Sequence, residues 1–233
     1  PIWAELRARD PASVEIAAGH IVALLKTGQK AVATSSLDAL LDQLNRQGDD
    51  KAIALNNLGI QLENMGAHAE AARVFGMAAA QPSAVQGKAG FSRAKNLNLA
   101  EQFREAAPHW LELDQKYPGL YQVKLGMTTA LIGSGRRAEA LNAAAALRDT
   151  LQGVSPRALA TSDGTAINAI AVSLENWGAS QLAADLFGQA AAINSPIRGK
   201  AKFSQAKNLN LAGSYEQALP VWLELEKKYP SVA

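Results

Sequence analysis

Apolar residues recur at spacings of three and four along most of the chain, which is the period of an amphipathic α-helix. Leu55, Leu58 and Leu62 show this spacing within one run. Helical runs separated by glycine or proline follow one another about every 34 residues. Because glycine readily adopts the left-handed conformation that ends a helix, we expect runs to end at Gly28, Gly66, Gly135 and Gly178. The pattern predicts an all-α chain of tandem helix–turn–helix units.

A longer repeat is superimposed on this pattern. Residues 54–118 match residues 166–230 at 36 of 65 positions without a gap. The densest agreement is between GKAGFSRAKNLNLA at 87–100 and GKAKFSQAKNLNLA at 199–212, which share 12 of 14 letters. Identity at this density over such a length indicates tandem duplication of a block of several helices.

A third, partial copy opens the chain. PIWAELRARDP at 1–11 aligns with PHWLELDQKYP at 108–118 and PVWLELEKKYP at 220–230. The sequence therefore starts in the middle of a unit, without an initiator Met, and stops just after another unit. Terminal units of such arrays usually carry a polar cap. We expect the chain to be a fragment of a longer protein.

The segment NNLGIQLENMGAHAEAARVFGMAAAQP at 56–82 resembles a tetratricopeptide repeat. The residues that carry the resemblance are Leu58, Gly59, Gly66, Ala71, Phe75, Ala78 and Pro82. The unit that follows has Glu101 at the turn in place of glycine, so we expect its turn to differ. The aromatic residue of the second helix fills the gap to the next unit in this family, which predicts that Trp110 and Trp222 lie in the core.

The resemblance covers nearly the whole chain and implies a right-handed α-solenoid. We expect a single array over 1–233, with a half repeat at 1–11 and an irregular insertion at 154–165. The expected repeats lie at about 12–48, 52–84, 87–119, 120–153, 164–197 and 199–231.

Composition narrows the range of functions. The 233 residues include 23 basic and 21 acidic side chains, and the basic ones are scattered, which argues against a nucleic-acid partner. The absence of cysteine excludes disulfides, thiolate zinc sites and cysteine nucleophiles, and fits either the cytoplasm or the periplasm. No apolar run approaches the roughly 20 residues of a membrane-spanning helix, so we expect no membrane insertion.

The sequence shows no pattern typical of catalysis. His20, His68 and His109 lie in different units without a second ligand at metal spacing, and His109 is replaced by Val221 in the copy. GSGRR at 133–137 lacks the Lys-Ser/Thr of a phosphate loop and indicates an inter-helix turn. We therefore predict no catalytic residue, no metal and no cofactor.

Several polar residues are kept between the copies although core packing does not require them. Their spacings of 3, 4 and 7 place them on one stripe of a first helix. By the resemblance, first helices line the concave groove of the array. The candidate groove residues are Lys88, Lys95 and Asn98, their copies Lys200, Lys207 and Asn210, and Asn56, Glu63, Asn168 and Glu175 from the preceding units.

Two interpretations of these residues remain open. They form a groove for a peptide of acidic and amide character, or they make contacts between repeats, such as a Glu63–Lys95 pair, that duplication copied. Some family members hold a C-terminal carboxylate with a Lys/Asn clamp. Asn56 and Ile60 stand at the clamp positions here, so that ligand is not predicted.

The leading hypothesis is a non-catalytic scaffold that binds a segment of another protein in its groove. One alternative is a structural or self-assembling spacer that associates through its end repeats. Another is an accessory region of a bacterial envelope or secretion machine, or of an enzyme, whose active part lies outside this chain. The bacterial origin is an expectation from the alanine-rich composition and the near-identical repeats.

Overall fold

The computed structural model describes residues 2–10, 13–46 and 51–228, and the regular elements within these ranges are all helices. The all-α fold predicted from the sequence is therefore confirmed. The chain divides into two compact units, Pro1–His109 and Trp110–Ala233, and the boundary falls inside one helix, α7.

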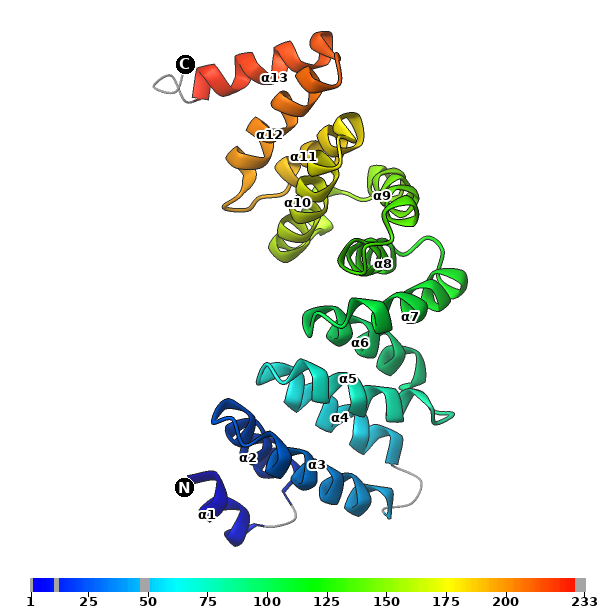
Figure 1. Ribbon diagram of the computed structural model, residues 1–233, viewed down its shortest axis with the longest axis vertical. Coiled ribbons are helices and arrows are strands. Elements are labelled where there is room, and N and C mark those ends of the chain that lie inside the picture. Colours follow the sequence, from blue (N-terminus) through cyan, green and yellow to red (C-terminus); the bar gives the residue numbers. More distant parts are fainter. Residues whose placement is uncertain (1, 11–12, 47–50, 229–233) are drawn as a thin grey trace. The chain divides into compact units, whose positions relative to one another are not determined.

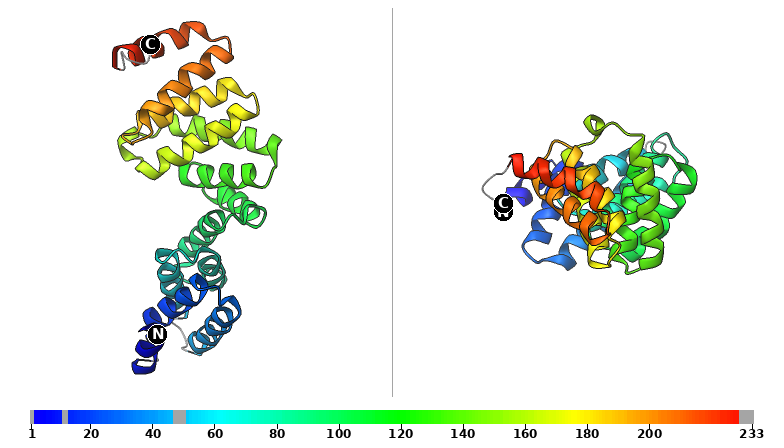
Figure 2. Two further views of the ribbon diagram at one scale, coloured as in Figure 1. Left: turned by 60° about the vertical axis from the view of Figure 1, so that its left-hand side comes forward. Right: turned by 90° about the horizontal axis from the view of Figure 1, so that it is seen from above.

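Unit 1 contains the helices α1 (Ile2–Arg9), α2 (Val14–Lys26), α3 (Lys30–Asn45), α4 (Lys51–Asn64), α5 (His68–Ala79), α6 (Gln86–Leu99) and the start of α7 (Phe103–Lys116). Unit 2 contains the rest of α7, then α8 (Tyr121–Gly133), α9 (Arg137–Gln152), the 3₁₀ turn η2 (Pro156–Ala158), α10 (Thr161–Asn176), α11 (Ser180–Ala192), α12 (Arg198–Leu211) and α13 (Tyr215–Lys228). Within unit 1 each helix from α1 to α6 packs against the next, and within unit 2 α8 packs against α9, and α10 to α13 pack in sequence order (Figures 1 and 2).

α1 lies within residues 1–11, and the later helices follow in pairs, of which those that open with α4, α6, α10 and α12 begin one to three residues before the repeat ranges given above. The irregular stretch between the blocks is shorter than expected, because α10 already begins at Thr161. Asp163 Oδ2 accepts the backbone N–H of Ala160 at 2.9 Å, which satisfies one free donor at the start of this helix. This contact allows α10 to begin within the predicted insertion.

Small residues let the two helices of a repeat approach closely. A Cβ built on Gly59 of α4 would lie 2.8 Å from the ring of Phe75 on α5. Phe75 and its copy Phe187 are completely buried. Glycine at the crossing therefore provides the space that the aromatic ring fills, which is the packing expected from the sequence.

A tryptophan makes the corresponding contact between repeats. Trp110 on α7 is 2% exposed, and a Cβ on Gly126 of α8 would come within 2.3 Å of its indole. The prediction that Trp110 lies in the core is confirmed. Trp222 on α13 is only half-buried, because no helix among the described residues occupies the place over it that α8 takes over Trp110.

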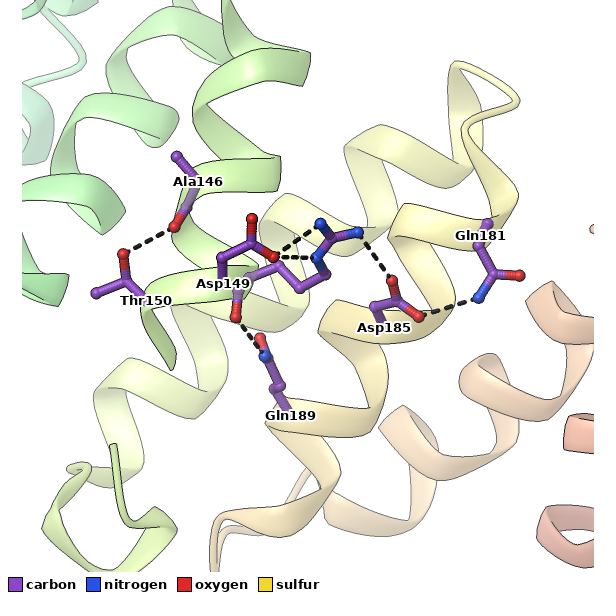
Figure 3. Close-up of polar contacts among 7 residues, drawn as sticks. Ala146, Asp149, Thr150, Gln181, Asp185 and Gln189 are labelled. Carbon is purple, nitrogen blue, oxygen red and sulfur yellow. Dashed lines mark hydrogen bonds and ion pairs between the residues drawn. The ribbon is translucent and has the colours of Figure 1, made fainter. Parts of the chain in front are cut away.

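The second helices of unit 2 are tied by a polar cluster (Figure 3). The guanidinium of Arg148 on α9 lies between Asp149, at 2.8 Å from Nε, and Asp185 of α11, at 3.3 Å. Gln189 donates to the backbone carbonyl of Arg148 at 2.8 Å, and Gln181 donates to Asp185 at 3.0 Å. The contacts of Arg148 with Asp185 and Gln189 join the two helices, so we assign the cluster the role of holding α9 against α11.

The turn after α6 corrects one expectation. Glu101 adopts φ 59°, in the left-handed region, and occupies the place that Gly213 takes at φ 74° in the copy. Its backbone N–H donates to the carbonyl of Asn98 at 3.0 Å, as that of Gly213 donates to the carbonyl of Asn210. The turn therefore has the same conformation with or without glycine, because the hydrogen bonds that end the helix require it.

We predict that Glu101→Gly raises the free energy of unfolding by about 1 kcal/mol, because a left-handed conformation costs a residue with a Cβ about that much. Urea denaturation followed by circular dichroism measures the change. Glu101→Ala is the matched control, since it removes the carboxylate but keeps the Cβ. An equal gain in both variants would locate the strain in the side-chain charge instead.

Candidate functional site

First helices of neighbouring repeats lie side by side within each unit, as α2, α4 and α6 do in unit 1 and α8 and α10 do in unit 2. Four of the first helices, α4, α6, α10 and α12, each present one stripe of exposed residues at spacings that include four, seven and eleven, which place them on one helical face. We call these stripes the first-helix face. Its exposed residues are Ile53, Asn57 and Asn64 of α4, Lys88, Lys95 and Leu99 of α6, Thr165, Ala169, Val172 and Asn176 of α10, and Lys200, Lys207 and Leu211 of α12.

A polar network lies directly beneath this face in unit 1. Lys95 Nζ donates to Glu63 Oε1 at 2.5 Å, so the pair joins α6 to α4. The amide nitrogen of Asn96 donates to Glu63 Oε2 at 2.8 Å and to the backbone carbonyl of Ser92 at 2.9 Å. Asn96 is completely buried, so these bonds satisfy a polar group that would otherwise be costly.

His68 at the start of α5 completes the network. Its Nδ1 lies 3.0 Å from Asn96 Oδ1. Because the amide nitrogen of Asn96 already faces a carboxylate and a carbonyl, Oδ1 is the acceptor and His68 Nδ1 carries the hydrogen. Three helices, α4, α5 and α6, are thereby tied through one buried asparagine.

Unit 2 repeats the network with one loss. Lys207 donates to Glu175 Oε1 at 2.5 Å, and Asn208 donates to Glu175 Oε2 at 2.5 Å and to the carbonyl of Ser204 at 2.9 Å. The residue equivalent to His68 is Ser180. Asn208 is completely buried, and its Oδ1 has no hydrogen-bond partner among the described residues.

The two glutamates are held in the charged form. Partial burial raises the pKa of Glu63, but the hydrogen bonds and positive charge of Lys95 and the bond from Asn96 outweigh burial and lower its pKa below the usual value. Burial likewise raises the pKa of Glu175. The hydrogen bonds from Lys207 and Asn208 and the charge of Lys207 outweigh burial, so the pKa is also lowered. Both carboxylates therefore act as stable anionic anchors between first helices.

The candidate groove residues are placed as follows. Lys95, Lys207, Glu63 and Glu175 pair with one another between first helices, which is the inter-repeat contact that the sequence left open. Lys88, Lys200 and Asn210 are exposed, and Asn98 and Asn168 are half-buried. Asn56 is 4% exposed and offers almost no surface to a partner, because its position on α4 faces the core; we therefore exclude it.

Sequence reasoning missed the residues at the centre of the network, Asn96 and Asn208. A signal for them exists in the pattern. Asn96 follows the buried Ala89 by seven residues, which places it on the inward face of α6. A polar residue at an inward position, identical in both copies, indicates a buried hydrogen-bonded group.

Three further features of the described residues concern a metal, the turn after α8 and a membrane. Among the described residues, no three His, Cys, Asp or Glu side chains gather in a way that would hold a metal ion. The residues 133–137 contain the turn between α8 and α9, which lies at 134–136, as expected from their sequence. Within the same described ranges, none of the helices combines the length and the apolar character needed to cross a membrane.

Comparison with known proteins supports the fold. No protein-family model matches the sequence, and no curated protein matches it. The solved structure of MamA from MSR-1 matches with a TM-score of 0.52 at 16% identity, over 79% of this chain and 100% of that one. A MamA mutant matches with a TM-score of 0.51 at 14% identity, over 77% and 98%.

MamA is a tetratricopeptide-repeat protein, and this chain has the same type of helical-repeat fold, as its sequence predicted. At this level of identity the likeness establishes the fold alone.

We predict that acid weakens the two glutamate networks. Because the pKa of each glutamate is lowered in the folded state, its ionisation stabilises the fold at pH values above the usual pKa of 4.5. This contribution is lost as the pH falls through the lowered pKa. The Glu63→Gln, Glu175→Gln variant should therefore melt below the original protein at about pH 6 and close to it at about pH 3. A Glu112→Gln, Glu226→Gln variant, altered at exposed positions, serves as control. A constant difference across this range would contradict the assignment.

Two single substitutions, His68→Ser and Ser180→His, test whether the histidine stabilises the network through the buried asparagine. His68→Ser should cost about 1–3 kcal/mol of unfolding free energy, because Asn96 Oδ1 loses its donor in a buried place. Ser180→His should instead stabilise by about 0.5–1.5 kcal/mol, since it supplies a donor to Asn208. Chemical denaturation of both single variants measures the two changes, and changes of the same sign would show that the histidine does not act through the asparagine.

Proposed function

We propose that the chain is a non-catalytic scaffold whose first-helix face binds an extended or helical segment of another protein. The observation that carries this proposal is the contrast between the repeated lysines. Lys95 and Lys207 are paired with glutamates between first helices. Lys88 and Lys200 are exposed, and neither has a hydrogen bond or ion pair with another described residue.

The surroundings of Lys88 and Lys200 favour a partner of mixed character. Exposed aliphatic side chains lie on the same face, with Leu99 49% exposed in unit 1 and Val172 43% exposed in unit 2. Exposed amides accompany them at Asn64 and Asn176. A segment that carries acidic residues beside apolar ones would pair with the ammonium groups and cover the aliphatic side chains.

The proposed face does not depend on the paired lysines. Reversing the charge of Lys95 or Lys207 would place a carboxylate beside Glu63 or Glu175 and weaken the fold as well as binding. Lys88 and Lys200 are therefore the informative positions, because their replacement leaves the network intact.

We predict that Lys88→Glu with Lys200→Glu weakens binding of acidic peptides selected from a random phage-displayed library on the unaltered protein. Two reversed charges at an exposed face should raise the Kd of such a peptide by about tenfold, which fluorescence anisotropy measures. The loss should diminish at high salt, because exposed charges are screened.

The matched control is Arg104→Glu with Lys227→Glu, which reverses two exposed charges on the second helices α7 and α13. It should leave the Kd unchanged, and circular dichroism should show equal helicity in all three proteins. Equal weakening in both double variants would mean that net charge, and not the first-helix face, governs binding.

A further inference from the structure

A cavity of about 350 Å³ opens in unit 1 at one end of the first-helix face. It is enclosed by the end of α2, the first residue of α3, the turn between α4 and α5, and the end of α6. Ligand pockets typically measure roughly 300–1,000 Å³, so this cavity has room for one or two side chains and not for a helix. Leu99, which belongs to the first-helix face, forms part of its wall, so a segment bound along that face would reach the cavity.

The cavity combines an aliphatic wall with two cations. Val22 and Leu25 of α2 and Leu99 of α6 supply the aliphatic wall, and Leu99 is 49% exposed. Lys26 and Lys30 supply the ammonium groups. Both lysine side chains are exposed, and neither has a hydrogen bond or ion pair with another described residue. The cavity therefore offers a partner both charge and aliphatic surface that the fold itself does not use.

Two further titratable side chains line the cavity. Glu70 of α5 places one carboxylate there, against the two ammonium groups, so the positive charge is in excess. His68 also lines the cavity, and its Nδ1 is held by Asn96 Oδ1 at 3.0 Å. The Nε2 of the neutral ring then carries a lone pair and has no hydrogen to donate to an anion. The ammonium groups of Lys26 and Lys30 are therefore the groups that attract a carboxylate.

The corresponding place in unit 2 uses its cation within the fold. Arg137 opens α9 directly after a glycine turn, as Lys30 opens α3 in unit 1. The guanidinium of Arg137 donates to the backbone carbonyl of Trp177 at 2.6 Å. It also lies over the indole of Trp177, at 5.6 Å from the ring centroid. A cation held by a carbonyl and a ring in this way is not available to a partner.

Unit 1 differs from unit 2 at the residues that decide this use. Met65 stands directly before the glycine of its turn, where unit 2 has Trp177, so Lys30 has no indole at the corresponding place. Lys26 corresponds to Gly133, since each lies two residues before the glycine of the next turn. Unit 1 therefore carries a second cation here, and both of its cations remain accessible.

We propose that this cavity binds an acidic residue of the partner segment together with an aliphatic neighbour of that residue. In this arrangement the carboxylate pairs with Lys26 and Lys30, and the aliphatic side chain covers Leu25 and Leu99. The inference rests on the proposed function, because it assigns one end of the segment bound on the first-helix face. It adds that unit 1 binds an acidic–aliphatic pair at this place and that unit 2 does not.

Titration of the whole chain with a blocked dipeptide, N-acetyl-glutamyl-leucine amide, tests the proposal through the amide chemical shifts measured by NMR. The probe should shift the amides of Gly66, Ala69 and Ala100, which line the cavity, with a Kd of about 1 mM. N-acetyl-glutaminyl-leucine amide lacks the charge and should bind at least about tenfold more weakly. Inorganic phosphate at constant ionic strength should not displace the probe, because phosphate leaves the aliphatic wall uncovered.

Removing the two cations should abolish this preference. Lys26→Gln with Lys30→Gln should raise the Kd of the acidic probe at least about tenfold. Lys88→Gln with Lys200→Gln is the matched control, because it removes the same charge from two other exposed lysines. Lys88 lies about 16 Å from Leu99 along α6, so the control should leave the Kd of the probe unchanged. Circular dichroism confirms the fold of each variant.

A second variant copies the arrangement of unit 2 without changing the net charge. In Lys30→Arg with Met65→Trp, the new guanidinium should engage the new indole and the carbonyl beside it, as Arg137 does. The Kd of the acidic probe should therefore rise. An unchanged Kd would contradict the role assigned to Lys30.

Several results would overturn the proposal. Equal binding of the two dipeptides, or displacement of the probe by phosphate, would mean that the cavity does not bind an acidic–aliphatic pair. The absence of saturable shifts, while Lys88→Glu with Lys200→Glu still weakens the selected peptides, would exclude the cavity and retain the first-helix face. Binding of the probe at the cavity, with no effect of that charge reversal on the selected peptides, would support the cavity and exclude the face.

Discussion

The fold depends on helices that bury an apolar face only against their neighbours in the series. Close approach of the backbones makes this burial complete, and it requires a small residue wherever a large ring crosses. Gly59 accommodates Phe75 within a repeat, and Gly126 accommodates Trp110 between repeats. Each helix therefore depends on the next one for cover.

Apolar packing alone does not determine the relative position of two first helices along their axes. Buried polar contacts determine it. The buried amides of Asn96 and Asn208 each bridge to a glutamate of the preceding first helix. A buried amide is costly when unpaired, so only one register satisfies it. Unit 1 completes this arrangement with His68, whereas unit 2 has Ser180 and leaves one acceptor unpaired. The duplicated blocks have thus diverged at a structural contact while keeping their fold.

The sequence predicted many of the candidate site residues. It did not separate the residues that pair between helices from those that remain exposed. Repetition marked Lys88, Lys95 and their copies as one set of candidates. It did not separate the paired Lys95 from the exposed Lys88, because a residue seven positions away lies on the same stripe of the helix. That difference depends on where Glu63 of another helix reaches, about thirty residues earlier in the chain. The sequence also concealed Asn96, since polar residues in a repeat are first interpreted as exposed.

By itself, the sequence determined the all-α class, the helix pairs and the family resemblance, because apolar periodicity and turn residues act locally and the duplication repeats their signal. Tertiary structure decided the rest. It showed that Glu101 adopts the conformation of a glycine, because the hydrogen bonds ending α6 impose it. In the folded chain Trp110 is buried against α8, whereas Trp222 is half-exposed, although both stand in the same motif. Burial depends on which helix lies opposite, and a local pattern of residues does not contain that information.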